Sequence, residues 1–164
     1  MEPEPFVLRR GRAADLPAML AIERSSFPDP WTEAAMTEEL ASEWPPLVAE
    51  AGGAVVGYVC LWRGPDECHV TNLAVQEDFR RRGLGRRLLE SAIETARQAG
   101  CRQLLLEVRP SNVAARRLYG RLGFVELYRR RRYYIKPSED GLVLVLPLAA
   151  RHPIAGRSDV REDG

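Results

Sequence analysis

Apolar side chains recur at helical spacing in four parts of the chain. The longest pattern follows Gly83 and sets an apolar face against a charged one, which predicts an amphipathic helix that stops at Gly100. Thr32 and Asn112 are suited to cap two of the others. The three shorter helices are predicted at residues 13–25, 34–40 and 112–122.

The other apolar runs have the alternation or the continuous hydrophobicity of strands. They predict strands at residues 6–8, 47–50, 54–62, 68–75, 103–108, 124–134 and 142–148. Turns at Gly52-Gly53 and at residues 137–141 would close two hairpins. Because strands and helices interleave along the chain, the pattern predicts an α/β fold.

The length of the chain suits one hydrophobic core. It has 164 residues, 45% of them hydrophobic, which is too few for two comfortable domains. We therefore expect one domain over residues 1–148. Residues 149–164 carry mixed charges and little apolar content, so we expect a disordered tail there.

The charge balance argues against some classes of partner. With 24 basic and 23 acidic side chains the net charge is +1, so no global field would draw the protein to nucleic acid or to an anionic membrane. No run approaches the roughly 18 apolar residues of a membrane span, and residues 1–12 lack the apolar stretch of a secretory signal. We expect a cytoplasmic protein with neither partner.

The three cysteines, Cys60, Cys68 and Cys101, are odd in number and far apart in the sequence. They form no Cys-x-x-Cys pair, and no histidine stands at the spacing of a metal ligand. We expect reduced core thiols and no metal site.

A glycine-rich turn, Arg80-Arg81-Arg82-Gly83-Leu84-Gly85-Arg86, separates the strand at 68–75 from the longest helix. Glycines at such a place let backbone amides converge on an anion at the positive end of the helix, so a phosphate or pyrophosphate would fit. The same residues could equally form a tight turn whose arginines face solvent.

Two other nucleotide motifs compete for this turn. A P-loop requires Gly-Lys-Ser or Gly-Lys-Thr, and the chain has neither. A dinucleotide fingerprint fits Gly83-x-Gly85 and the downstream acid Glu107, but Leu88 replaces its third glycine. The charged stretch 76–82 also separates the glycines from the strand. The dinucleotide interpretation therefore ranks below the one that follows.

Arg80-x-x-Gly83-x-Gly85, after the strand Asn72-Leu73-Ala74-Val75, resembles the acetyl-CoA-binding motif of the GNAT superfamily of N-acetyltransferases. Leu106-Glu107-Val108-Arg109-Pro110-Ser111-Asn112 and Leu118-Tyr119-x-x-Leu122-Gly123-Phe124 resemble its RimI branch, the bacterial ribosomal-protein alanine N-acetyltransferases. The resemblance covers residues 6–148. It implies the GNAT fold, in which a mixed central sheet of about seven strands is flanked by about four helices.

Acetyl-CoA is the cosubstrate that the resemblance implies. Main-chain groups of Leu73, Ala74 and Val75 would pair with the pantetheine arm as an added strand does. Asn112 would contact the cofactor, although it could equally serve only as a helix cap. The pyrophosphate would lie against Arg81, Arg82, Gly83, Leu84, Gly85 and Arg86. Valine at Gly85 should then abolish binding, because it would fill the phosphate space and resist a left-handed backbone.

Glu107 and Tyr119 are the catalytic residues that the resemblance implies. Glu107 would take a proton from the acceptor ammonium, directly or through a water. From the residues alone, it could instead be a strand-end glutamate paired with an arginine such as Arg109. Tyr119 would protonate the departing CoA thiolate, since a tyrosine with a pKa near 10 is protonated at neutral pH. Without the resemblance, it would be an edge of the apolar core.

The acceptor would be bound by Trp31, Tyr133 and Tyr134, which have counterparts in the same branch. Arg132 departs from the asparagine expected before the tyrosine pair. The implied reaction is acetyl transfer to the N-terminal α-amine of a protein, with the N-terminal alanine of a small-subunit ribosomal protein as the leading acceptor. Acetylation of a lysine or a small amine, and a CoA-binding module without turnover, remain as alternatives.

Overall fold

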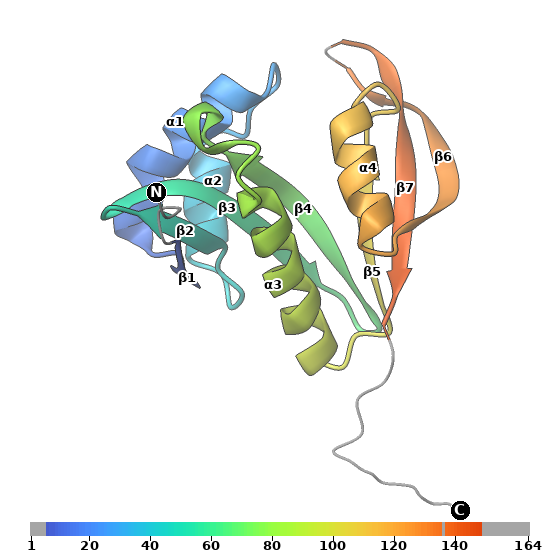
Figure 1. Cartoon of the computed structure of the whole chain (residues 1–164), viewed down its shortest axis with the longest axis horizontal. Coiled ribbons are helices and arrows are strands. Elements are labelled where there is room, and N and C mark those ends of the chain that lie inside the picture. Colours follow the sequence, from blue (N-terminus) through green and yellow to red (C-terminus); the bar gives the residue numbers. More distant parts are fainter. Residues whose placement is uncertain (1–5, 136, 149–164) are drawn as a thin grey trace, which may run out of the picture.

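A mixed sheet of seven strands runs through the protein, whose computed structural model describes residues 6–135 and 137–148 (Figure 1). The strands lie in the order β1-β2-β3-β4-β5-β7-β6. Every neighbouring pair is antiparallel except β4 with β5, which is parallel. The bounds are β1 Val7–Arg10, β2 Leu47–Ala51, β3 Ala54–Arg63, β4 Glu67–Val75, β5 Gln103–Val108, β6 Val125–Tyr134 and β7 Glu139–Pro147.

Helices cover both faces of this sheet. On one face α1 packs against β3 and β4 and is joined by α2, and on the other face lie α3 and α4 (Figure 1). Short 3-10 turns at Ala13–Asp15 and Glu77–Phe79 precede α1 and α3. The bounds are α1 Leu16–Ser26, α2 Glu33–Leu40, α3 Leu84–Gln98 and α4 Val113–Arg121.

Alternation along the strands builds two cores from one sheet. In β3, Tyr58 and Cys60 are buried in the core under α1 and α2, whereas Val59 between them joins the core under α3. Successive side chains of a strand point to opposite faces, so a strand covered on both faces is apolar at nearly every position. The predicted α/β architecture with its mixed sheet is confirmed.

Most predicted elements begin and end close to their predicted residues. β5 has the predicted bounds, Thr32 accepts a hydrogen bond from the Ala35 amide at 3.1 Å as the cap of α2, and Gly100 has the left-handed backbone of a helix stop, with φ +83°. The largest difference is in the last hairpin, where β7 begins at Glu139 instead of Leu142. The residues expected to form a loose turn are therefore partly paired.

The expectation of three reduced thiols is wrong for two of the cysteines. Cys68 and Cys101 form a disulfide, while Cys60 is free and buried. The parallel register sets Cys68 beside Leu104, which brings Cys101 within a Cα–Cα distance of 6.2 Å although 33 residues separate the two cysteines in the chain. The sequence could not reveal the pair, because it depends on how β4 and β5 align.

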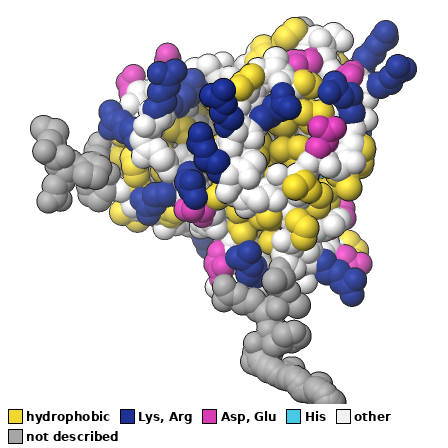
Figure 2. Space-filling model, turned by 45° about the vertical axis from the view of Figure 1, so that its right-hand side comes forward, with side chains coloured by type: hydrophobic (Ala, Val, Ile, Leu, Met, Phe, Trp, Pro, Cys, Tyr) yellow, Lys and Arg dark blue, Asp and Glu magenta, His cyan; other side chains and the backbone are white. Residues whose placement is uncertain are grey.

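Apolar side chains reach the surface around α4 and β6. Val113, Val125 and Leu127 are each more than half exposed, and Figure 2 shows apolar side chains interspersed with basic and acidic ones on this side. Within the described ranges, no helix is both long and apolar enough to span a membrane. The predicted disordered tail, residues 149–164, lies outside the residues that the structure describes.

Candidate active site

Strands β4 and β5 pair at one end and diverge at the other. Their register joins only Glu67 with Gln103, Cys68 with Leu104 and His69 with Leu105. The strands then separate, and α3 and α4 lie on either side of the divergence (Figure 1). Leu73, Ala74 and Val75 thus pair with β3 on one side and with no strand of the described chain on the other. Their main-chain groups that face away from β3, apart from the Val75 carbonyl, which accepts from Arg80, could accept an extended ligand as an added strand.

The glycine-rich turn leads from the diverging end of β4 into α3. Arg80 fixes the start of the turn, since its Nε donates to the Val75 carbonyl at 2.9 Å and its Nη2 to the Ser26 hydroxyl at 3.1 Å. Arg81 and Gly83 have left-handed backbone, with φ +64° and +81°, and Gly83 is the N-cap of α3. The turn therefore leads directly from the end of β4 to the first amides of α3, which begins at Leu84 and whose N-terminal amides have no partner within the helix.

The expected left-handed backbone at Gly85 is wrong, because Gly85 lies in the first turn of α3 without a positive φ. A Cβ built on it would meet only Val75 Cγ2, at 4.0 Å. Neither backbone strain nor a close neighbour in the chain requires a glycine at this position. The open space above it is the cradle that a phosphate at a helix N-terminus needs, so the residues fit a pyrophosphate.

The side chains of the turn are partly engaged already. Arg82 lies over the Phe79 ring at 4.9 Å, and Arg86 is paired with Glu90 at 3.0 Å, one helical turn away. Exposed pairs of this kind contribute little to stability and are easily exchanged. The contact of each with a pyrophosphate stays a prediction.

Glu107 lies near the end of β5, with 16% of its side chain exposed. Its ion-pair partner is Arg130 of β6, at 3.8 Å. The alternative of a strand-end glutamate paired with an arginine thus fits, although the partner is Arg130 and not Arg109, which donates to the Pro137 carbonyl at 2.7 Å and contacts Glu139 at 3.4 Å. Glu107 and Arg130 therefore lie on the same face of the sheet, one on each side of β7.

Tyr119 lies on the side of α4 that packs on the sheet. Its ring is 5.9 Å from the Phe124 ring, and burial raises the pKa of Tyr119 to about 12. At neutral pH the hydroxyl is thus protonated and able to donate. Asn112 caps the same helix, since its Oδ1 accepts from the Ala115 amide at 3.1 Å. The cap is confirmed, and its cofactor contact stays a prediction.

The last two residues of β6 are the predicted acceptor-binding tyrosines, Tyr133 and Tyr134. Burial raises the pKa of Tyr134, and the nearby Tyr133, Glu107 and Tyr119 raise it further. Tyr134 is thus within electrostatic range of Glu107 and Tyr119, which come from different elements. The rings of Tyr133 and Tyr134 meet edge to face at 4.9 Å.

A bulge in β6 sets the positions of these tyrosines. Arg130 pairs with Gly141 and Tyr134 with Glu139, so four steps along β6 match two along β7. Arg132 takes up the difference with a φ of +50°, and its amide donates to Asp140 Oδ1 at 2.9 Å. Tyr133 packs so closely on Gly141 that a Cβ there would lie 2.9 Å from it.

Trp31 is held in place by a buried carboxylate that the sequence analysis missed. Glu23 of α1 is 1% exposed, and its Oε2 accepts from the Trp31 amide at 2.9 Å. Its Oε1 accepts from Asn72 Nδ2 at 2.8 Å and from the Tyr58 hydroxyl. A buried carboxylate needs such donors, and here they come from three segments. Glu23 thus ties the link before α2 to β3 and to the residue before Leu73.

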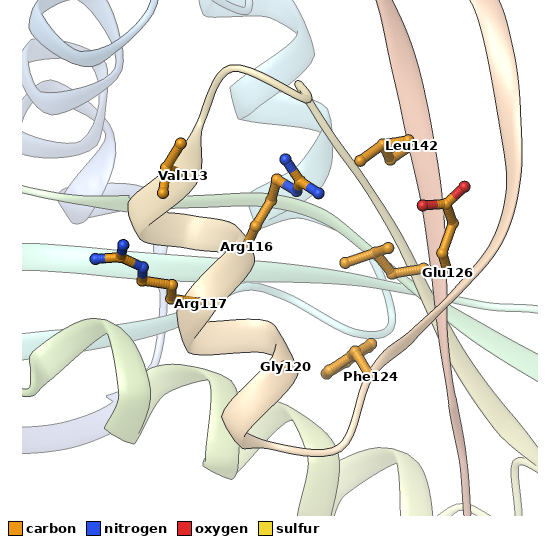
Figure 3. Close-up of a pocket in the computed structure, with 8 residues that line it drawn as sticks. Val113, Arg116, Arg117, Gly120, Phe124, Glu126 and Leu142 are labelled. Atoms are coloured by element: carbon orange, nitrogen blue, oxygen red, sulfur yellow. The ribbon is translucent and has the colours of Figure 1, made fainter.

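A hollow beside α4 lies apart from the predicted site residues. It has a volume of about 410 Å³, with an apolar floor of Phe124, Leu142 and Leu144 (Figure 3). Arg116 and Arg117 extend from α4 at its rim. None of the predicted site residues lines it. Among the described residues, no cluster of three or more His, Cys, Asp or Glu side chains could hold a metal ion.

Comparison with known proteins gives relatives over most of the chain. The [ribosomal protein bS18]-alanine N-acetyltransferase of Salmonella typhimurium is 38% identical over 137 residues, which are 82% of this chain and 93% of that protein. The N-alpha-acetyltransferase RimI of Mycobacterium tuberculosis is 40% identical over 148 residues, 86% of this chain and 92% of that protein. The crystal structure of the ribosomal-protein-S18-alanine N-acetyltransferase from Escherichia coli superimposes with a TM-score of 0.83 at 33% identity, covering 90% of this chain and 97% of that one.

The family comparison agrees with the fold and with the motif of the turn. The model of the acetyltransferase (GNAT) family matches residues 16–124, which include the diverging strands, the glycine-rich turn and α4. With relatives above 30% identity that cover more than four fifths of the chain, the predicted resemblance is confirmed, and the chain belongs to the GNAT acetyltransferase family.

Proposed function

We propose that the protein transfers the acetyl group of acetyl-CoA to the N-terminal α-amine of a protein, with the N-terminal alanine of ribosomal protein bS18 as its acceptor. Relatives that carry this activity in their names match most of the chain. The structural observation that carries the proposal is the divergence of β4 from β5, which leaves an unpaired strand edge at residues 73–75 next to the glycine-rich turn, with the base candidate Glu107 near the end of β5.

The proposed cosubstrate site uses main chain more than side chains. The free edge of Leu73, Ala74 and Val75 would hold the pantetheine arm, and the first amides of α3 above Gly85 would hold the pyrophosphate. Acetyl-CoA supplies the thioester. Related folds have been solved with acetyl-CoA, among them the NAA60 protein of Arabidopsis thaliana, at 20% identity and a TM-score of 0.79.

Each proposed catalytic residue moves one proton. An N-terminal ammonium, with an ordinary pKa near 8, must lose a proton before its nitrogen attacks the thioester carbonyl. Glu107 would accept that proton directly or through a water. As the C–S bond breaks, Tyr119 donates a proton to the thiolate. Trp31 and the Tyr133–Tyr134 pair would flank the acceptor chain.

A panel of peptides tests the acceptor class. Peptides with the N-terminal sequence of bS18 are offered with a free N-terminus, with an acetylated N-terminus and one internal lysine, and with the first alanine replaced by methionine. Mass spectrometry should locate new acetyl groups only on the free α-amine, with alanine preferred. Acetylation of the blocked peptide at its lysine would reject the proposal in favour of a lysine acetyltransferase.

A further inference from the structure

Two arginines lie over the rings of two neighbouring tyrosines of the candidate site. The guanidinium of Arg109 is 4.2 Å from the centre of the Tyr134 ring, and that of Arg130 is 4.4 Å from the centre of the Tyr133 ring. Each arginine is also near an acid, Glu139 for Arg109 and Glu107 for Arg130. The two arrangements look alike, but their contacts differ in strength.

Arg109 is fixed in its position. It donates to the Pro137 carbonyl at 2.7 Å, and its acid Glu139 is itself held by the Ser111 amide and hydroxyl, each at 2.9 Å. Only 21% of its side chain is exposed. These contacts join the end of β5 to the β6–β7 turn, so Arg109 has a structural role.

Arg130 is held loosely by comparison. Its side chain is 48% exposed, its distance to Glu107 is 3.8 Å, and within the described part of the chain it makes no side-chain hydrogen bond. An ion pair of that length, shared with solvent, contributes little. If Arg130 moves away from Glu107, the only other contact that it loses among the described residues is the one with the face of the Tyr133 ring.

The surroundings of Arg130 are those that bind an ammonium group. A carboxylate supplies the opposite charge and an aromatic face supplies a cation–π contact. The ring cannot follow the arginine away, because Tyr133 is packed on Gly141 and the bulge behind it is held by Asp140. Once Arg130 moves, the carboxylate and the ring remain as a preformed subsite for another cation.

We propose that the guanidinium of Arg130 occupies, in the free protein, the subsite between Glu107 and Tyr133 that the acceptor ammonium takes during the reaction. The inference rests on the proposed function, because it takes Glu107 as the proton acceptor. Arg130 is then a built-in competitor that a cationic acceptor displaces. It selects for amines that arrive protonated, and it keeps Glu107 paired between turnovers.

Steady-state kinetics of two matched variants test this assignment. Arg130→Gln removes the competing charge, and Arg131→Gln makes the same change at the next residue of β6, which has no ion pair with Glu107 and no contact with the Tyr133 ring among the described residues. With the accepted peptide, Arg130→Gln should lower KM by about threefold to tenfold at an unchanged kcat. Arg131→Gln should leave both values near wild type.

Each other result contradicts the proposal. A lower kcat at an unchanged KM would mean that Arg130 orients Glu107, a higher KM would mean that it contacts the acceptor, and no change would make it a bystander. Calorimetric titration of the peptide into the protein with CoA gives a second readout without turnover, in which Arg130→Gln should bind more tightly by the same factor. If wild type acetylates only lysine peptides, the proposed function fails, and the Arg130 test is repeated with that acceptor.

Discussion

At the scale of single residues, replacing Glu107 with glutamine tests the proposed base. The change keeps the volume and removes the proton acceptor, so kcat should fall by roughly 10² to 10⁴. The deficit should shrink as pH rises toward the pKa of the acceptor amine, near 8, because more acceptor then arrives deprotonated. Turnover is measured from pH 6 to 9, and acetyl-CoA affinity near that of wild type is the control. A deficit that does not change with pH would argue against this role.

Tyr119→Phe tests the proposed acid and should behave differently with pH. Burial raises the pKa of Tyr119 to about 12, so the hydroxyl remains protonated from pH 6 to 9 and its loss cannot be compensated by raising the pH within that range. We expect a loss in kcat of similar size, which lessens with an acyl donor whose thiol is a better leaving group. A wild-type rate in this variant would remove Tyr119 from the mechanism.

Arg132 has a backbone conformation that its side chain does not favour. Its φ of +50° is tolerated far better by asparagine, the residue that the resemblance led us to expect there. Arg132→Asn should therefore raise the free energy of unfolding by roughly 0.5–1 kcal/mol. Urea denaturation would show a higher midpoint with the same slope, and Arg131→Asn is the matched control. A loss of stability would mean that the arginine side chain supports the bulge.

At the scale of elements, a substitution in the first turn of α3 should affect folding stability and ligand binding in opposite directions. Gly85→Ala adds a Cβ in open space, so it should raise the stability of the free protein by about 0.5 kcal/mol and yet weaken acetyl-CoA binding by at least about tenfold. Gly120→Ala in α4, where a Cβ would meet no atom within 4 Å, is the control for helix propensity and should bind normally. Melting curves and calorimetry measure both effects. Unchanged binding by Gly85→Ala would place the pyrophosphate elsewhere.

Elements with a local pattern could be predicted closely, and those set by long-range pairing could not. The apolar stripe of α3 and the run Leu104–Leu106 of β5 are legible in consecutive residues. The bulge in β6 is not, because it exists only where Asp140 of another strand accepts from the Arg132 amide. Glu23 left a signal that was overlooked, since it lies one helical turn after the buried Met19 and Leu20 and hence on the apolar side of α1.

At the scale of the whole molecule, binding of acetyl-CoA should stabilise the fold. A ligand bound only by the folded state adds about 2.7 kcal/mol at 100 times its dissociation constant, so the melting temperature should rise with its concentration. NAD and ATP at equal concentration should raise it less. If NAD raised the melting temperature as much as acetyl-CoA, the glycine-rich turn would be better interpreted as a dinucleotide-binding motif.

The sequence could predict only part of the candidate site, because the rest of it depends on the order of the strands in the sheet. Glu107 and Tyr119 could be proposed as catalytic residues because they lie in motifs that resemble a known family. Their neighbour Arg130 could not, because β7 lies between β5 and β6, so that Arg130 reaches Glu107 across a strand that comes later in the sequence. The spacing of residues along the sequence does not reveal a contact between two strands that a third strand separates.

The divergence of β4 from β5 also has a consequence for association with other proteins. Two edges with free main-chain groups would ordinarily invite a strand from a neighbouring chain, which is a route to aggregation. A regular strand keeps a constant spacing of about 4.8 Å from both of its neighbours. The edges of β4 and β5, however, are paired as far as His69 and Leu105 and move apart beyond these residues. No straight strand can pair with both along its length. A wedge of this shape favours a short ligand with few amide groups over a polypeptide, and so the gap in the sheet is protected by its geometry.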